Sequence, residues 1–140
     1  MEGQNIGNAL YGLRYMNSDC VEVKEILEAL SPLIEKSPEI MNGQALGNSL
    51  YGLQGMHSKE PEVRNLLRIL AKKIMDTSHK LKAQEIGNSL YGMKRMSSDV
   101  PEVRMIIDAL VPKIRSSPEK LDSQAIGNSF YGMQNMKVKN

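Results

Sequence analysis

The sequence predicts an all-α fold, an α-solenoid of three and a half helix-turn-helix repeats of 40 residues each. One observation is a phrase that occurs four times at a constant interval, beginning at Gln4, Gln44, Gln84 and Gln124. The other is a second recurring segment between these copies, in which apolar residues follow the three-and-four spacing of a helix face. In chains of this kind each unit packs mainly on its neighbours.

We expect residues 1–140 to form a single α-solenoid. The repeats are predicted at about 2–41, 42–81 and 82–121, and a terminal half repeat is predicted at 122–136. Terminal repeats of such arrays need a polar outer face, and neither end of this chain has the sequence of a dedicated cap. Two expectations follow: a longer parent array, or end-to-end self-association.

The first helix of the third repeat is predicted over residues 84–96. Ile86, Leu90 and Met93 share one face there and are expected in the core. Asn42 and Asp122 stand just before the equivalent helices of other repeats, where a short polar side chain can cap the first backbone N–H groups.

The second helix is predicted to begin after a short turn. Asp99 and Glu102 have capping-box spacing, as do Asp19 and Glu22, and Pro101 falls in the first helical turn. The predicted core face of this helix in the third repeat consists of Val103, Ile106, Ile107, Leu110 and Ile114.

Prolines also fall late in two of the second helices, at Pro32 and Pro112. A proline in a helix interior removes one hydrogen-bond donor and clashes with the preceding turn. We expect these helices to kink or end there.

A polar and aromatic stripe runs along the other side of the first helices. Each residue of an α-helix turns by about 100°, so Gln84, Asn88, Tyr91 and Arg95 lie within about one sixth of a turn of each other. The candidate binding residues of all repeats are Gln4, Asn8, Tyr11, Tyr15, Gln44, Asn48, Tyr51, Gln84, Asn88, Tyr91, Arg95, Gln124, Asn128, Tyr131 and Asn135. One position of the stripe differs in every repeat and forms a variable row. Its residues are Tyr15, Gly55, Arg95 and Asn135.

Two glycines per repeat flank this stripe, Gly87 and Gly92 in the third repeat. Glycine inside a helix costs about 1 kcal/mol relative to alanine, so eight of them cost on the order of 8 kcal/mol. The simplest offset is a close backbone approach between the first helices of successive repeats. That packing would place the stripes side by side as one surface.

The stripe has a structural interpretation and a functional one. In the structural one, amides in register bond to each other or to the backbone, and tyrosines cover the bare glycine flank. In the functional one, amides offer donors and acceptors together while tyrosines offer stacking faces, the groups that recognise unpaired bases.

Residues 121–133 also resemble the first helix of octotricopeptide repeats, with Gln124, Asn128 and Tyr131 at matching positions. Related helical repeats of RAP-domain and FAST-kinase-like proteins share the phrase. The resemblance covers all three and a half repeats and implies single-stranded RNA binding, with about one base per repeat. The family often has Trp and Ala where this chain has Tyr and Gly, so no base code is carried over.

Other features exclude several classes of protein. Neither His57 nor His79 recurs or stands near a residue that would suggest catalysis, and no zinc-like cluster exists, so we expect no enzyme, no metal and no cofactor. The single Cys20 allows no internal disulfide and favours an intracellular protein of the cytoplasm or an organelle. No apolar run approaches the roughly 20 residues of a membrane span.

Single-stranded RNA is therefore the first expected partner. The formal net charge of +2 gives little attraction for a polyanion, so an extended peptide or protein segment is the main alternative. A self-assembling structural array is the third.

Overall fold

The computed structural model describes residues 2–137, and this part of the chain contains seven α-helices and no β-strand. The helices are α1 (Gly3–Tyr11), α2 (Val21–Lys36), α3 (Gly43–Tyr51), α4 (Pro61–Asp76), α5 (Ala83–Tyr91), α6 (Pro101–Arg115) and α7 (Ser123–Gly132). The all-α prediction is confirmed.

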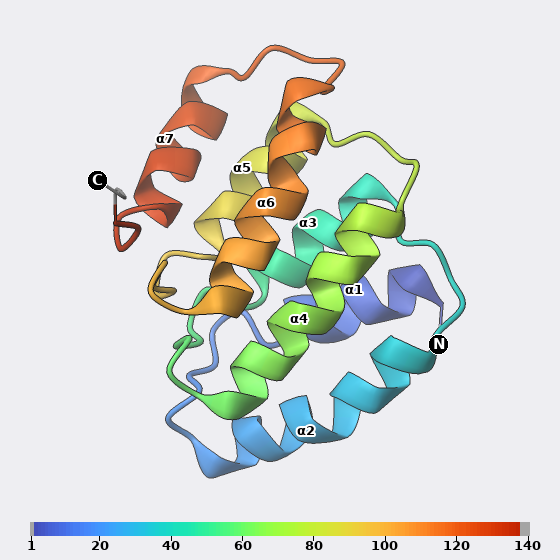
Figure 1. Ribbon diagram of the computed structural model, residues 1–140, viewed down its shortest axis with the longest axis vertical. Helices are drawn as coiled ribbons and strands as arrows, with labels where there is room; N and C mark the ends of the chain where they lie inside the picture. Colours follow the sequence, from blue (N-terminus) through green and yellow to red (C-terminus); the bar gives the residue numbers. More distant parts are fainter. Residues whose placement is uncertain (1, 138–140) are drawn as a thin grey trace.

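The helices form two rows. The short helices α1, α3, α5 and α7 pack side by side in one row, and the longer helices α2, α4 and α6 form the other (Figure 1). Helices that hold the same place in successive sequence repeats thus pack against each other.

The apolar core draws its residues from both rows. The predicted core residues of the first helix, Ile86, Leu90 and Met93, are all buried. In the middle repeat the core face of the second helix is fully buried and consists of Val63, Leu66, Leu67, Leu70 and Ile74. In α6 the matching Ile107 and Ile114 are only half-buried, because no further long helix follows in the described residues.

The predicted backbone approach between first helices is confirmed at the glycines. A Cβ atom at Gly7 would lie 3.0 Å from the Ala45 Cα atom of the next first helix, and Gly47 and Gly87 have the same kind of contact at 3.3 and 3.2 Å. The second glycine of each pair faces the other way: a Cβ at Gly92 would overlap the Leu50 carbonyl of the preceding repeat. Glycine therefore permits backbone contact on both sides of a first helix.

The predicted end of the first helix at residue 96 is wrong, because α5 ends at Tyr91. The chain then tightens, so that the backbone N–H groups of Met93 and Met96 donate to carbonyls three residues earlier, Leu90 O and Met93 O. Both methionines remain buried. Arg95 consequently lies on a turn beyond the helix, as do Tyr15 and Asn135 in their repeats.

The predicted capping boxes of the second helices are also wrong. The N-cap residues are Cys20, Glu60 and Val100, and none makes a side-chain cap bond. Cys20 and Val100 each stand one position after the expected aspartate, Asp19 or Asp99. The helix starts later because the preceding turn has its own bonds, with the Asp99 N–H donating to Ser97 Oγ at 3.2 Å.

The caps of two first helices are as predicted. Asn42 Oδ1 accepts from the Ala45 N–H at 2.8 Å, and Asp122 Oδ1 accepts from the Ala125 N–H at 2.7 Å. At α5, Lys82 has no side-chain acceptor, and the Glu85 carboxylate instead accepts from the Lys82 N–H at 2.8 Å.

The prolines late in the second helices do not end them. Helix α2 continues through Pro32 to Lys36, and α6 continues through Pro112 to Arg115. Both prolines are exposed, so a carbonyl that loses its helical donor can turn towards water.

Serines of the turns add hydrogen bonds between repeats. Ser18 Oγ accepts from the His57 N–H at 2.8 Å, and Ser58 Oγ accepts from the Ser97 N–H at 2.9 Å. Ser98 continues the series by accepting from the Lys137 N–H at 2.7 Å. These bonds hold successive turns in register at one edge of the first-helix row.

We expect Gly92→Ala to destabilise the protein by about 3 kcal/mol, because the added methyl group would overlap the Leu50 carbonyl. Gly127→Ala is the matched control, since a Cβ there meets nothing within 4 Å, and it should stabilise α7 by about 1 kcal/mol. Urea denaturation followed by circular dichroism measures both changes. Equal midpoints for the two variants would contradict this account of the helix contact.

Candidate functional site

The polar stripe faces an open groove on the first-helix row. The groove has a volume of about 420 Å³, and residues of all four first helices line it. The lining residues are Tyr11, Asn48, Tyr51, Gln84, Asn88, Tyr91, Gln124 and Asn128. Side chains from four different repeats, predicted to share one surface, therefore do share it.

The amide side chains of the polar stripe remain accessible, both the five that line the groove and the three beside it, Gln4, Asn8 and Gln44. The glutamine row is exposed in every repeat, and the asparagine row is exposed at Asn8 and half-buried at Asn48, Asn88 and Asn128. Within residues 2–137 none of these eight amides makes a hydrogen bond to another protein group. The interpretation in which the amides satisfy each other as a ladder is wrong for this part of the chain.

The tyrosines form a continuous stack across the four repeats. The ring centroids of Tyr11 and Tyr51 are 5.8 Å apart, those of Tyr51 and Tyr91 are 5.5 Å apart, and those of Tyr91 and Tyr131 are 5.4 Å apart. The angles between ring planes are 23°, 22° and 19°, which is an offset-stacked arrangement.

This stack changes the role expected for the rings. A base inserted between two rings needs a separation of about 7 Å, two stacking steps of about 3.4 Å each. Tyr51 and Tyr91 have a neighbouring ring on both faces, so neither offers a free face to a base. Tyr131 has a single tyrosine neighbour and is 51% exposed. The interior rings can offer a ligand only their edges and hydroxyl groups.

Cationic side chains lie over the ring stack. Arg14 Cζ is 4.1 Å from the Tyr11 ring centroid and 4.5 Å from that of Tyr15. Lys94 Nζ is 4.6 Å from the Tyr91 centroid and bonds to the Tyr91 hydroxyl at 3.3 Å. Ring faces attract cations, so these contacts hold positive charge beside the amide rows.

Arg14 and Lys94 were not among the predicted binding residues, although they share one position of the repeat. Gln54 and Gln134 occupy that position in the other repeats, and Lys94 Nζ reaches Gln54 Oε1 at 3.3 Å. The sequence did contain a signal for this position, because every repeat has a long polar side chain there.

The variable row behaves differently from the other rows because it lies on the turns. Asn135 donates its amide to the Lys94 carbonyl at 2.8 Å, and Arg95 Nη1 lies 3.2 Å from His57 Nε2. Gly55 is a packing residue, since a Cβ there would overlap the Met16 carbonyl. Tyr15 is 83% exposed beside Arg14. The structure therefore separates this row from the groove, where the predicted stripe had joined them.

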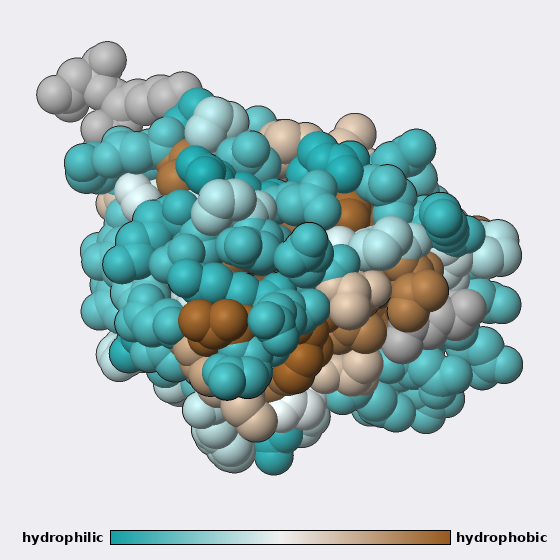
Figure 2. All heavy atoms as spheres, turned by 90° about the horizontal axis from the view of Figure 1, so that it is seen from below, coloured by the Kyte–Doolittle hydropathy of each residue, from teal (hydrophilic) through white to brown (hydrophobic). Residues whose placement is uncertain are grey.

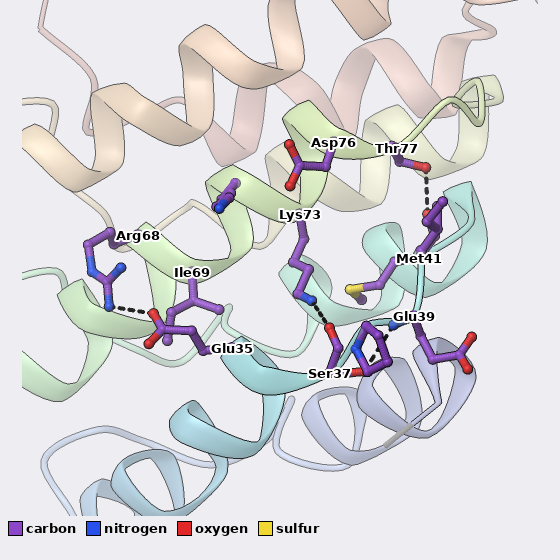
Figure 3. Close-up of a pocket in the computed structure, with 12 residues that line it drawn as sticks. Glu35, Ser37, Glu39, Met41, Arg68, Ile69, Lys73, Asp76 and Thr77 are labelled. Carbon is purple, nitrogen blue, oxygen red and sulfur yellow. Dashed lines mark hydrogen bonds and ion pairs between the residues drawn. The ribbon is translucent and has the colours of Figure 1, made fainter.

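A second hollow of about 410 Å³ lies between the 37–41 linker and α4 (Figure 3). Hydrogen bonds between repeats cross it: Lys73 Nζ donates to the Ser37 carbonyl at 2.6 Å and Thr77 Oγ1 donates to the Met41 carbonyl at 2.7 Å. The first of these recurs 40 residues later, where Lys113 Nζ donates to the Thr77 carbonyl at 2.6 Å. We attribute this hollow to the joint between repeats.

Two carboxyl groups whose pKa is shifted lie outside the groove, Asp99 and Glu22. The pKa of the Asp99 carboxyl is lowered by a hydrogen bond from Lys137 and by the attraction of its charge. The pKa of Glu22 is lowered mainly by a hydrogen bond from the Cys20 thiol. Both carboxylates are exposed at the start of second helices.

Residues 2–137 contain no group of three or more His, Cys, Asp or Glu side chains placed to hold a metal ion. No helix in the same residues combines the length and the apolar character needed to cross a membrane.

Comparisons with known proteins add no relative: no family model, no curated protein and no solved structure matches the chain.

We expect Tyr51→Ala to lower the free energy of unfolding by about 2 kcal/mol, because it removes two ring contacts worth about 0.5–1.5 kcal/mol each. Tyr51→Phe keeps both stacks and should unfold at nearly the wild-type urea concentration. If Tyr51→Ala is as stable as Tyr51→Phe, the stack contributes nothing to the fold.

Proposed function

We propose that the chain is an α-solenoid scaffold of three and a half 40-residue repeats, without catalytic activity, that binds single-stranded RNA along the first-helix groove. The observation that carries the proposal is the set of eight accessible amides in the stripe. None of them makes a hydrogen bond to another protein group within residues 2–137. Polar groups in rows, left without protein partners, are available for a ligand.

The chemistry of the amides fits the edges of unpaired bases. Each Gln or Asn side chain presents two N–H donors and one carbonyl acceptor, which suits the mixed donors and acceptors of a base edge. Asn48 and Asn88 lie at the centre of the groove. The ring hydroxyls of Tyr51 and Tyr91 supply further polar contacts beside them.

The cations over the tyrosines give the groove its attraction for phosphate. Arg14 and Lys94 lie over tyrosine rings, and Arg95 lies on the turn that follows Lys94, outside the groove lining. Three such charges support moderate affinity. The resemblance of the first helices to octotricopeptide repeats also supports RNA as the ligand. The expected location is the cytoplasm or an organelle.

An extended peptide is the second candidate ligand. It is favoured by the covered ring faces of Tyr51 and Tyr91, which remove base stacking from the interior of the groove, and by the net charge of only +2. The amide rows could bond to a peptide backbone with the same donors and acceptors.

Fluorescence anisotropy with labelled single-stranded RNA, single-stranded DNA and duplex RNA tests the proposal. Neutralising about three phosphates predicts that single-stranded RNA binding weakens about 20-fold between 50 and 200 mM salt. The double variant Asn48→Ala/Asn88→Ala should weaken binding about 30-fold, from two lost hydrogen bonds of about 1 kcal/mol each.

Asn65→Ala is the control, since Asn65 is an exposed amide on α4 in the other row. It should bind RNA as the wild type does. No RNA binding at 50 mM salt would overturn the proposal. Capture of extended peptides that depends on Asn48 and Asn88 would then establish the peptide candidate.

A further inference from the structure

The two glycines of a first helix contact neighbours on opposite sides. Gly7, Gly47 and Gly87 pack against the following first helix, while Gly52, Gly92 and Gly132 pack against the preceding one. One glycine at each end therefore has no such neighbour within the described residues. A Cβ at Gly127 would meet nothing within 4 Å, and a Cβ at Gly12 would meet only carbonyls of its own repeat, the nearest at 3.3 Å.

The first repeat exposes apolar side chains that are buried in later repeats. Met16 is 48% exposed, whereas the equivalent Met56 is fully buried. Ile26 on α2 is 41% exposed, whereas the equivalent Leu66 is fully buried, and this side chain belongs to the second-helix row. Figure 2 views the molecule from this end, where an apolar band lies among polar atoms.

At the other end of the chain, α7 leaves apolar side chains uncovered. Phe130 is 75% exposed and Ile126 is 42% exposed, although the equivalent Leu50 and Leu46 are buried. The two ends of the chain are thus the two complementary sides of one repeating interface.

We propose that two copies of this chain associate head to tail, with α1 of the second copy packing on α7 of the first as α7 packs on α5 within the chain. Gly127 would meet Asn5 of the second copy, and Gly12 of that copy would meet the Phe130 carbonyl. The ring of Tyr131 would continue onto Tyr11 of the second copy. This inference is independent of the nature of any ligand.

The contacts within the chain show that such an interface fits. Asn5 stands where Ala45, Glu85 and Ala125 stand in the other repeats. Gly47 accommodates Glu85, with a hypothetical Cβ 3.3 Å from the Glu85 Cα and 3.4 Å from its Cβ. A polar side chain at this place is therefore compatible with the contact, because only its first atoms approach the glycine.

The first-helix row alone can form this contact. Helix α7 packs on α5 although no long helix follows α7 in the described residues. A docked copy would repeat that situation, with α1 on α7. Because the two surfaces differ, the contact is heterologous, and its repetition gives open chains of copies rather than a closed dimer.

Sedimentation equilibrium over a range of protein concentrations tests the proposal. The wild-type mass should rise from 15.6 kDa towards multiples of it as concentration increases. Gly127→Leu and Gly12→Leu should each stay at the monomer mass, because each blocks one end with a side chain that has room in the free monomer. Lys72→Leu adds an exposed leucine to α4 away from both ends and should associate as the wild type does.

A mixture of the two blocked variants separates head-to-tail packing from other association. Gly127→Leu retains a competent first end and Gly12→Leu retains a competent last end, so together they should form a dimer of twice the monomer mass that grows no further. Unchanged helical circular dichroism confirms that each variant is folded. A wild type that remains monomeric, blocked variants that associate like the wild type, or a mixture that remains monomeric would each overturn the proposal.

Discussion

Backbone contact between neighbouring first helices determines the geometry of the whole chain. At Gly7, Gly47 and Gly87 one side of the contact is a bare Cα, and at Gly52, Gly92 and Gly132 a carbonyl of the preceding repeat occupies the space that a side chain would need. Such packing brings helices closer together than ordinary side chains allow. Its gain offsets the intrinsic preference of glycine for non-helical states.

The properties of the groove follow from this close approach. Helices held so tightly bring equivalent side chains within reach of each other, so the tyrosines stack at 5.4–5.8 Å and leave little ring surface for a ligand. The shorter Asn side chains lie one turn earlier on the same face and remain apart. One helix spacing therefore produces a rigid aromatic row and an unbonded amide row side by side.

The sequence predicted what depends on local period and missed what depends on contacts between repeats. Helix type, the buried faces and the glycine contacts all follow from residues such as Ile86, Leu90 and Gly87 within one repeat. The end of the helix at Tyr91 and the late start at Pro101 do not, because they accompany turns that Ser58 and Ser98 bond to the next repeat. The mutual stacking of Tyr51 and Tyr91 likewise requires knowledge of the distance between helices.

The glycine contact also bears on how an array of this kind can lengthen. A Cβ added at the contact glycines would meet backbone or Cβ atoms of the neighbouring helix, which almost every amino acid possesses. A duplicated 40-residue unit would meet neighbours that already fit it, with no compensating substitution at the junction. Growth of such an array by duplication would thus require no coordinated change at solvent-facing positions such as Arg95.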